Sequence, residues 1–472
     1  MKNIELVWGS RVVFFGEASQ GKSTLMGFMF AESEKVNMDR HEEDLREELG
    51  KYYKDEYLYS SLINPLVLDI SDSNQRYRTR RYHLRNFVIK DEDPIIITMI
   101  DTPGQIGPEY RRARSNQDYG TSKGKIGVFC LSMNAITDEG FNGSVFNRTK
   151  LWRATHRNGK LIIALTKFDD NINEFYKESD YQNAVNIIQN YFNDSEIACI
   201  IPTAIDFKNR KGTNVFSGNN NIEWYRGLSL IDAIKERYFE IANNTFTGFL
   251  PSDLIFSIDR EYAYPRSNAG KVWKVYIENG VLKPGTPITL TSVKRENHTI
   301  LEPISANATV KELRMDIKID YDIDEEQCAY RDSTVSINLK DCYIDGDKVK
   351  KREIETTEQT IGLSASIEYK MLNKLFIRFV NEEDLLKFKS EKQEALCYIF
   401  GRGTSIKVSK FADDLSGVII ETISDKFFTF PTRDDLQSLT IFKDIIIRIP
   451  AENNDFDYLP AKIDFDLTNS IS

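Results

Sequence analysis

The feature that most constrains this chain is the sequence GEASQGKST, which runs from Gly16 to Thr24. It fits the pattern G-x-x-x-x-G-K-[ST], a loop whose backbone N–H groups surround nucleotide phosphates. An apolar run, Val12 to Phe15, precedes it and is typical of a short buried strand. The residues that follow predict a helix face packed on a sheet: Leu25, Met26, Phe28 and Met29. Because a strand precedes the pattern and a helix follows it, we interpret it as a phosphate-binding loop rather than a glycine-bearing turn.

The expected contacts of this loop follow from its chemistry. Lys22 would reach the β- and γ-phosphates, and the Ser23 hydroxyl would bind Mg²⁺. The N-terminus of the following helix adds the positive end of its dipole. The residues expected to line the nucleotide site here are Gly16, Glu17, Ala18, Ser19, Gln20, Gly21, Lys22, Ser23 and Thr24.

The composition indicates a globular protein with more than one domain. A chain of 472 residues is too long to fold around a single hydrophobic core, so about two to four domains are expected. The net charge of −10 argues against nucleic-acid binding over the whole surface, but it leaves room for a local basic patch. The cysteines and histidines have no ligand spacing, so we expect reduced thiols, no structural metal and a cytoplasmic protein. No apolar stretch approaches the about 20 residues of a membrane span, and no signal peptide is evident, so no membrane partner is expected.

A second motif, Asp101-Thr102-Pro103-Gly104, ends the apolar strand predicted at 94–100. An acidic residue at the tip of a central strand, downstream of a phosphate loop, is where a carboxylate facing Mg²⁺ belongs. We therefore expect Asp101 to face the metal and Gly104 to let the next peptide approach the γ-phosphate. The motif alone would also suit an ordinary turn, and its position after the strand decides between the two.

A third motif, TKFD at 166–169, follows the strand predicted at 161–165. The Asp169 carboxylate can accept hydrogen bonds from guanine N1–H and the 2-amino group, which adenine lacks. Lys167 would lay its methylene stem along the base. A backbone N–H after the strand predicted at 197–201 would meet guanine O6. The residues expected to contact the base are therefore Thr166, Lys167, Asp169, Thr203 and Ala204.

Apolar strands and helical stretches alternate through the first half of the chain. Further strands are predicted at 82–89 and 126–131, and a helix is predicted at 181–192. This alternation is typical of a doubly wound α/β domain with its ligand at the strand tips. The charged stretch from Glu32 to Tyr59 is predicted to be a solvated helix, packed along one side through Leu45, Leu49 and Tyr52.

The order and spacing of these motifs resemble those of translational GTPases of the elongation factor 1-alpha type. That family has GHVDHGKST for GEASQGKST, DTPGH or DAPGH for Asp101 to Gln105, and NKxD for Thr166 to Asp169. Its ERGIT switch segment aligns with Gln75 to Thr79, and its PWYKGPTLLEAL resembles the stretch that begins at Ile222. The resemblance implies GTP and GDP as ligands with Mg²⁺, and it makes Thr79 the metal-binding switch threonine.

Beyond about residue 245 the pattern changes to short alternating strands with Gly, Pro and Asn turns, which predicts β-barrels. The stretch GKVWKVYIENGVLKPG, from Gly270 to Gly285, resembles the family's GTVPVGRVETGVLKPG in its second domain. We therefore expect an α/β P-loop GTPase domain followed by two β-barrel domains. The expected limits are 1–243 for the GTPase domain, 244–358 for the second domain and 359–472 for a β-rich third domain.

The sequence departs from the family at positions that bear on function. Gln105 replaces the histidine that orients the attacking water, and a glutamine amide can do the same in related GTPases. Thr166 replaces Asn and keeps a hydroxyl hydrogen bond, while Ser19 and Gln20 replace Asp-His. The residues expected to act in catalysis are Gln105, Lys22 and Gly104.

These motifs predict a GTP-hydrolysing switch in translation, which delivers tRNA or a protein factor to the ribosome or rescues ribosomes. In the second domain Val275 and Tyr276 replace Gly-Arg, so its cargo pocket is expected to differ. Two other classes stay open: a non-ribosomal regulatory subunit like the sulfate-activation GTPase, and a nucleotide-dependent binding scaffold with negligible turnover.

Arginines are concentrated near both switch segments. They suit a phosphate-rich partner such as ribosomal RNA. Ion pairs with the acidic stretch at 42–48, or the action of one arginine in cis on the transition state, are alternatives. The arginines concerned are Arg76, Arg78, Arg80, Arg81, Arg111, Arg112 and Arg114.

Overall fold

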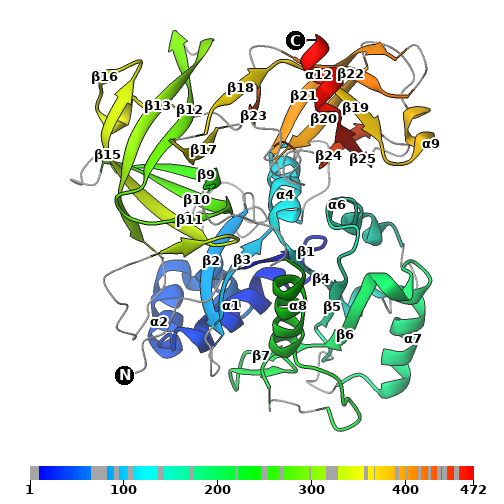
Figure 1. Ribbon diagram of the computed structural model, residues 1–472. Helices are drawn as coiled ribbons and strands as arrows, with labels where there is room; N and C mark the ends of the chain where they lie inside the picture. Colours follow the sequence, from blue (N-terminus) through cyan, green and yellow to red (C-terminus); the bar gives the residue numbers. More distant parts are fainter. Residues whose placement is uncertain are drawn as a thin grey trace. The chain divides into compact units, whose positions relative to one another are not determined.

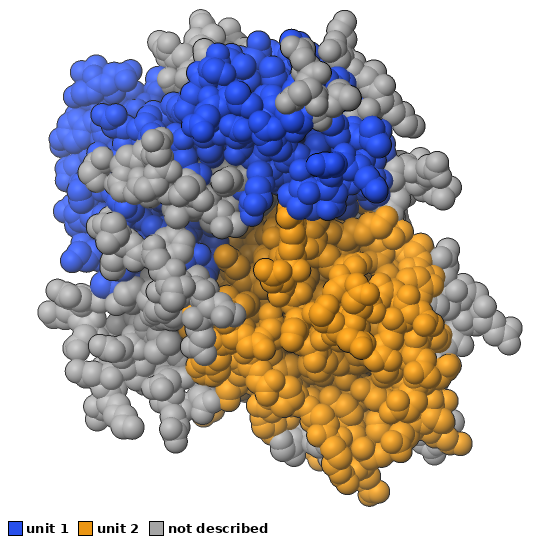
Figure 2. Space-filling view, turned by 45° about the vertical axis from the view of Figure 1, so that its right-hand side comes forward, with its two compact units in different colours: residues 1–9, 248–472 blue, residues 10–247 orange. Residues whose placement is uncertain are grey.

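A computed structural model gives the fold (Figure 1). It describes residues 10–64, 82–89, 95–104, 111–136, 143–169, 175–217, 222–245, 253–264, 270–296, 299–314, 328–355, 360–365, 367–387, 393–399, 402–412, 416–423, 427–432, 437, 444–450 and 456–471. The chain divides into two compact units, Ser10–Thr247 and Gly248–Ser472, and the second unit also includes Met1–Gly9. Figure 2 distinguishes the two units by colour.

The first unit is built on a six-stranded sheet with the order β2-β3-β1-β4-β5-β6. Strand β2 is antiparallel to β3, and every other neighbouring pair is parallel. The strands are β1 (Ser10–Phe15), β2 (His83–Ile89), β3 (Ile95–Asp101), β4 (Ile126–Ser132), β5 (Leu161–Thr166) and β6 (Ile197–Pro202). Each lies within two residues of its predicted range, which confirms the α/β class. Because β1 and β3 are parallel neighbours, the segments that follow them meet at one edge of the sheet.

Helices pack against this sheet along its whole width. Helix α1 (Lys22–Ser33) contacts β1, β2 and β3, α4 (Arg111–Lys123) contacts β1 and β3, and α8 (Leu230–Thr245) contacts β4, β5 and β6. Shorter helices are α5 (Met133–Ile136) and α6 (Lys150–Thr155), with 3₁₀ turns at Gly143–Thr149 and Asp194–Glu196. The helix predicted at 181–192 is α7 (Glu178–Gln189), which begins earlier because Asp180 caps its N-terminus by accepting from the Lys177 N–H at 3.0 Å.

The charged stretch from Glu32 to Tyr59 was predicted to form one helix, and this prediction was wrong. It contains α2 (Met38–Leu49), a 3₁₀ turn (Gly50–Tyr52) and the start of α3 (Tyr57–Ile63). The break occurs at Gly50, whose φ of 50° lies in the left-handed region. Leu45 and Leu49 are buried as expected, but Tyr52 lies past the break and is 45% exposed.

Helix α3 packs closely on α1. An ideal Cβ at Gly27 would lie 1.9 Å from the Tyr59 carbonyl oxygen, so only glycine allows this approach of the two backbones. The rings of Phe28 and Tyr59 then meet edge to face, with 5.3 Å between centroids. Strands β7 (Ala204–Asp206) and β8 (Lys211–Thr213) form a hairpin, and Phe207 at its turn lies 6.0 Å from Tyr59, centroid to centroid.

The second unit begins with a closed barrel of six strands. Its order is β10-β9-β17-β12-β13-β15, and pairing of β10 with β15 closes it. These strands are β9 (Ile255–Tyr264), β10 (Gly270–Asn279), β12 (Pro287–Glu296), β13 (Thr299–Arg314), β15 (Thr334–Ile344) and β17 (Ile361–Ser364). Strand β16 (Asp347–Lys348) extends the sheet beyond β15, and β11 (Val281–Leu282) and β14 (Ala329–Tyr330) form a separate two-stranded sheet.

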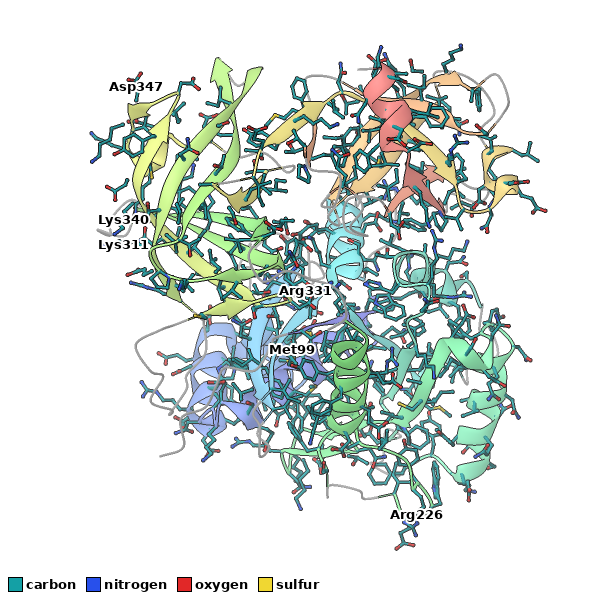
Figure 3. The ribbon with its side chains drawn as sticks, in the orientation of Figure 1. Met99, Arg226, Lys311, Arg331, Lys340 and Asp347 are labelled. Atoms are coloured by element: carbon teal, nitrogen blue, oxygen red, sulfur yellow. The ribbon has the colours of Figure 1, made fainter. Side chains whose placement is uncertain are left out.

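The side chains of alternate strand residues fill the interior of this barrel. Trp273, Val275 and Ile277 of β10 are buried in its core, as are alternate residues of β15. Lys311 and Lys340 are exposed on the neighbouring strands β13 and β15 (Figure 3). Strand β17 lies beyond residue 358, yet it pairs with β9 and β12 in this barrel. The domain limits at 243/244 and 358/359 stay proposals.

A second closed barrel follows, with the order β19-β22-β21-β20-β24-β25. Its strands are β19 (Lys374–Phe379), β20 (Glu394–Ile399), β21 (Arg402–Phe411), β22 (Val418–Thr422), β24 (Asp444–Pro450) and β25 (Phe456–Ile463). The remaining elements are β18 (Tyr369–Leu372), β23 (Phe428–Pro431), α9 (Glu382–Leu385), α12 (Phe465–Ile471) and a 3₁₀ turn at Lys351–Glu353. A GTPase-like α/β sheet followed by two barrels is the predicted fold class, which is confirmed.

Two features do not occur in the described ranges. No helix in them is long and apolar enough to span a bilayer. Nor do these ranges contain a group of three or more His, Cys, Asp or Glu side chains placed to hold a metal ion.

Candidate nucleotide and metal site

The phosphate-binding loop that begins at Gly16, called the P-loop below, connects β1 to α1. Its backbone conformation depends on glycines. Gly16 has a φ of 143°, and an ideal Cβ there would lie 2.4 Å from the Cys130 carbonyl oxygen of β4. Gly21 has a φ of 77° and caps α1. Among the described residues, no side chain caps this helix end. The first turn of α1 therefore presents backbone N–H groups toward the loop, as a phosphate site requires.

Lys22 is the buried cation of this site. Its Nζ donates to the Glu17 carbonyl oxygen at 2.6 Å, so the side chain folds back over the loop. Burial lowers the pKa of the Lys22 ammonium, and the Asp101 carboxylate acts in the opposite direction. An anion beside this group would favour its charged form, which is what a polyphosphate provides.

Three side chains converge beside Lys22. The Ser23 hydroxyl donates to Asp101 Oδ2 at 2.7 Å. The Asn64 amide Nδ2 donates to Ser23 Oγ at 3.1 Å and to Asp101 Oδ2 at 2.9 Å. The predicted metal residues Ser23 and Asp101 are thus brought together. Sequence analysis missed Asn64, whose only local signal is that it precedes a proline at the end of an apolar helix.

The segment after Asp101 runs against the P-loop. Thr102 Oγ1 donates to the Phe14 carbonyl oxygen at 3.0 Å, which ties the tip of β3 to β1. An ideal Cβ at Gly104 would lie 2.4 Å from the Ala18 nitrogen, so glycine is needed for this close approach. Two predicted residues, Thr79 and Gln105, lie outside the described residues, and their roles stay predictions.

The TKFD loop lies at the tip of β5 and is bonded to the P-loop. Thr166 Oγ1 donates to the Gln20 carbonyl oxygen at 2.9 Å, so the hydroxyl in place of the family's Asn keeps a hydrogen bond. Gln20 Oε1 accepts from the Ser132 N–H at the tip of β4 at 2.5 Å. Gln20 thus joins the ends of three neighbouring elements, a role that its sequence position did not indicate.

Backbone hydrogen bonds hold the base-contacting segments together. The Phe168 N–H donates to the Thr203 carbonyl oxygen at 3.1 Å, and the Thr203 N–H donates to the Leu165 carbonyl oxygen at 2.7 Å. Lys167 is exposed with a φ of 53°, and Asp169 forms an isolated antiparallel bridge with Phe175. The structure therefore brings Thr166 to Asp169 together with Thr203 and Ala204, and their contact with a guanine base stays a prediction.

Aromatic rings pack around Phe168 of the TKFD loop. Phe168 is fully buried, and its ring centroid lies 5.6 Å from Tyr176, 6.2 Å from Tyr181 and 6.0 Å from Trp224. Trp224 belongs to the stretch that resembles PWYKGP, so its contact with Phe168 gives that stretch a structural role. Such a cluster fixes the backbone that carries Lys167 and Asp169.

A second cation lies at the P-loop. Arg148, from the 3₁₀ turn at 143–149, has a side chain that is 7% exposed, and its Nε lies 4.0 Å from Glu17 Oε1. Its charge also acts on Lys22, whose pKa it lowers. Sequence analysis missed Arg148, because nothing in its neighbourhood marks it as a residue of the loop.

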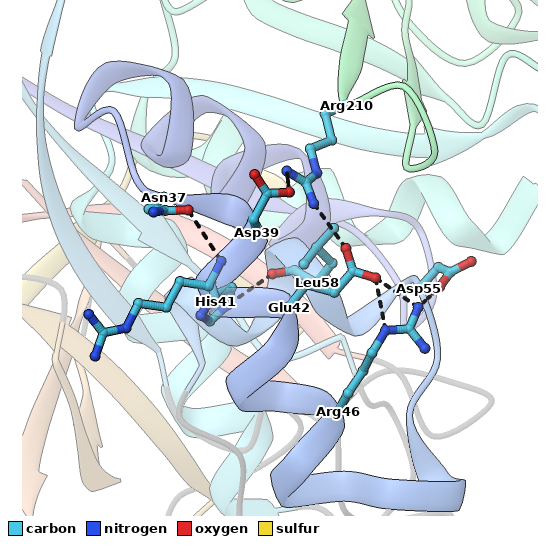
Figure 4. A network of polar contacts seen from close by, with 9 residues as sticks. Asn37, Asp39, His41, Glu42, Arg46, Asp55, Leu58 and Arg210 are labelled. Carbon is cyan, nitrogen blue, oxygen red and sulfur yellow. Dashed lines mark hydrogen bonds and ion pairs between the residues drawn. The ribbon is translucent and has the colours of Figure 1, made fainter.

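The helices before the first switch segment are fixed by a polar network (Figure 4). His41 Nε2 of α2 lies 3.1 Å from the Leu58 carbonyl oxygen and 2.9 Å from Ser61 Oγ, both of α3. Burial lowers the pKa of His41. Asn37 caps α2 by accepting from the Arg40 N–H at 3.2 Å.

The same network reaches the β7–β8 hairpin. Arg210 Nη1 lies 2.6 Å from Asp39 Oδ1, and Arg210 Nη2 lies 3.1 Å from Glu42 Oε2. Arg46 also binds Glu42, at 2.7 Å. The acidic helix therefore pairs with its own Arg46 and with the hairpin. The four arginines at 76–81 lie outside the described residues, so their expected ion pairs stay predictions.

In the first barrel, the two departures from the family lie on opposite sides of β10. Val275 points into the barrel core. Tyr276 OH donates to Asp332 Oδ1. A remodelled cargo pocket at this place stays a prediction.

Known proteins resemble this chain in sequence and in fold. No family model matches the chain. It is 25% identical to elongation factor 1-alpha of Nanoarchaeum equitans over 297 residues, which cover 62% of this chain and 61% of that protein. It is 23% identical to elongation factor 1-alpha of Euglena gracilis over 325 residues, 64% of this chain and 67% of that protein. The match to the Nanoarchaeum protein thus spans less than two thirds of that relative's length.

Solved structures with the same fold cover nearly all of the chain. The S. cerevisiae Ski7 GTPase-like domain bound to GTP aligns with a TM-score of 0.65 and 14% identity over 97% of each chain. Elongation factor SelB of Methanococcus maripaludis, in complex with the GTP analogue GPPNHP, aligns with a TM-score of 0.58 and 12% identity over 98% of this chain and 80% of that one. The chain is therefore similar in sequence to elongation factor 1-alpha over about two thirds of its length, and it shares its fold with solved GTPase structures.

Proposed function

We propose that this protein is a molecular switch that binds GTP, hydrolyses it to GDP and phosphate with Mg²⁺, and acts in translation. The observation that carries the proposal is the contact between Ser23 and Asp101 at 2.7 Å, beside the buried Lys22 and under the glycine-dependent P-loop. An ordinary turn does not require a buried lysine next to a hydroxyl and a carboxylate of the kind that bind Mg²⁺.

The residues present fit Mg²⁺ and a polyphosphate. The Ser23 hydroxyl and the Asp101 carboxylate are hard oxygen donors of the kind that Mg²⁺ prefers, with phosphate oxygens completing its shell. When bound, Mg²⁺ neutralises charge that develops on the transferred phosphoryl group. Lys22 holds the phosphates, Gly104 lets its peptide approach the γ-phosphate, and Thr79 supplies a further metal ligand. Gln105 places the attacking water.

Selectivity for guanine comes from the base end of the site. Asp169 accepts from guanine N1–H and the 2-amino group, while Lys167 and the Thr203–Ala204 backbone contact the base face and O6. The Thr166 bond to Gln20 sets the distance between this end and the phosphates. Loss of the γ-phosphate releases the switch segments that contain Thr79 and Gln105.

Nucleotide titrations test the proposal directly. Fluorescent GTP, GDP, ATP and xanthosine triphosphate are titrated into the full chain with Mg²⁺, and single-turnover hydrolysis of GTP is followed with and without ribosomes. We expect tight GTP and GDP binding, weak ATP binding and hydrolysis that ribosomes stimulate. Equal binding of ATP and GTP would overturn the guanine assignment.

The role in translation is proposed from the sequence relatives named elongation factor 1-alpha. The proposed partners are the ribosome and either tRNA or a protein cargo, in the cytoplasm. Recovery of ribosomes with the GTP-locked protein from native cytosol supports this role. A co-purifying enzyme would favour a regulatory subunit like the sulfate-activation GTPase, and tight GTP binding without turnover would favour a scaffold.

A further inference from the structure

We propose that Asn64 is a positioning residue of the metal centre, which orients Ser23 and Asp101 for Mg²⁺ and joins the metal to helix α3. The inference rests on the proposed function, because it assigns a further residue to the same site. None of the three sequence motifs contains Asn64, and it lies at the end of a helix in a different part of the chain from Ser23 and Asp101.

The geometry gives one amide nitrogen two acceptors. Asn64 Nδ2 lies 3.1 Å from Ser23 Oγ and 2.9 Å from Asp101 Oδ2, and those two oxygens are 2.7 Å apart. The three atoms form a triangle in which each pair is at hydrogen-bond distance. An amide NH₂ carries two hydrogens, so it can serve both oxygens at once.

This triangle fixes the direction in which Ser23 can bind a cation. A hydroxyl has one hydrogen and two lone pairs. With its hydrogen directed at Asp101 and one lone pair directed at Asn64, its rotation is determined, and so is the direction of its second lone pair. Asn64 also fixes the plane of the Asp101 carboxylate through Oδ2. The loss of a partner that orients metal ligands in this way typically lowers metal affinity by about 10- to 100-fold.

The placement of Asn64 suits a positioning role. Its backbone N–H donates to the Ser60 carbonyl oxygen at 2.9 Å and closes the last turn of α3, so its side chain is not needed to cap the helix. Its φ of −106° and ψ of 112° are extended, a conformation that alanine adopts without strain. Helix α3 is held on α1 by the Gly27–Tyr59 contact, so Asn64, which directly follows the last residue of α3, is anchored by a fixed element.

The alternative hypothesis is that Asn64 only stabilises the packing of α3 against the sheet. The two hypotheses differ in one measurable way. A structural tie stabilises the site equally with and without Mg²⁺, whereas a residue that orients metal ligands matters only when the metal is bound. The Mg²⁺ dependence of nucleotide affinity therefore distinguishes the two hypotheses.

The test compares Asn64→Ala and Asn64→Leu with Asn37→Ala in the full chain. Asn37→Ala is the matched control, since it removes an amide side chain that contacts Arg40 at the start of α2, away from Ser23 and Asp101. For each protein the dissociation constant of a fluorescent GDP is measured over a Mg²⁺ series and in EDTA, and thermal unfolding is recorded.

We expect both Asn64 variants to need about 10-fold or more Mg²⁺ for half-maximal stabilisation of GDP, with affinity in EDTA changed by no more than a few-fold. Asn37→Ala should keep the wild-type Mg²⁺ midpoint. Because leucine nearly fills the space of asparagine, agreement between the two variants excludes a packing defect as the cause.

Two results overturn the inference, and they are distinct from failure of the proposed function. A wild-type Mg²⁺ midpoint in Asn64→Ala, or an equal loss of GDP affinity in Mg²⁺ and EDTA, would leave Asn64 as a structural tie while the GTPase assignment stands. Absence of guanine-nucleotide binding in the wild-type protein would instead remove the proposed function, and this inference with it.

Discussion

The two ends of the nucleotide site are built from different kinds of contact. At the phosphate end, Lys22 and Asp101 are buried and Ser23 is half-buried. The Ser23 hydroxyl is bonded to Asp101, and the Lys22 ammonium is bonded to a backbone carbonyl of the P-loop. At the base end, the TKFD loop is held by backbone hydrogen bonds and by rings around Phe168. The Thr166–Gln20 bond connects the two ends.

This difference has a physical consequence for how each end acts. Buried charges interact strongly with a polyphosphate, so the phosphate end determines how tightly any nucleotide binds and how fast it reacts. A loop fixed by its backbone presents one carboxylate at a set position, so the base end determines which nucleotide binds. Changes at the first end should alter affinity or rate for every nucleotide, and changes at the second should alter selectivity.

The largest effect is expected for Gln105→Ala. If Gln105 orients the attacking water, its loss should lower ribosome-stimulated hydrolysis by about 100-fold or more and leave GTP and GDP affinities within a few-fold. Single-turnover hydrolysis together with nucleotide titration measures both quantities. Gln105→His should retain part of the activity. Wild-type hydrolysis by Gln105→Ala would move this role to an arginine or to the partner.

Lys22→Ala should weaken GTP and GDP alike, by about 10- to 100-fold, because it removes a charge-assisted contact at the phosphate end. The ratio of GTP to ATP affinity should not change, since the base end is intact. Calorimetric titration of all three nucleotides provides the test, with Lys51→Ala, an exposed lysine, as the control. A changed GTP/ATP ratio would contradict the division of labour between the two ends.

Asp169→Asn should reverse selectivity rather than abolish binding. The change replaces an acceptor with a donor, so GTP should weaken by about 10-fold or more while xanthosine triphosphate, whose 2-oxo group accepts, gains. Competition between the two nucleotides for the wild type and the variant measures the shift. Loss of both nucleotides to the same degree would mean that Asp169 maintains the loop instead of reading the base.

The smallest effect concerns the helices behind the phosphate end and is read from pH. Burial lowers the pKa of His41 from its usual 6.5. Below that value the unfolded chain binds a proton that the folded chain resists, so stability falls as the pH drops through about 6.5 and stops falling below the folded-state pKa. Thermal unfolding of wild type and His41→Gln from pH 7.5 to 5 compares the two curves. Parallel curves would show that His41 does not sense protons.

Local sequence patterns predicted the elements that carry the site, and tertiary packing determined the rest. The P-loop and the strands that end at Asp101 and Thr166 have strong local signals, because glycines and apolar runs specify their backbone directly. Asn64, Arg148 and the Gln20 side chain have no such signal. Their places depend on how distant segments pack, which a single sequence does not state.

The wrong prediction of a single helix for the charged stretch has the same cause at a smaller scale. Tyr52 fits the helical spacing of Leu45 and Leu49, but a left-handed glycine at position 50 ends the helix first, and the ring stays exposed. A periodic spacing of apolar residues does not reveal that a single glycine between them ends the helix. Strand β17 pairs with β9 and β12 although it is far from them in the sequence, and composition alone does not reveal such a pairing.

The contact at Gly27 also offers a marker that can be read without a structure. Since a Cβ there would lie 1.9 Å from the Tyr59 carbonyl oxygen, a protein that carries any side chain at the equivalent position cannot seat a helix where α3 lies. In such a protein the residue equivalent to Asn64 would lose its support. A single codon in the P-loop helix would thus separate proteins able to use this metal-centre arrangement from those that must hold the metal in another way.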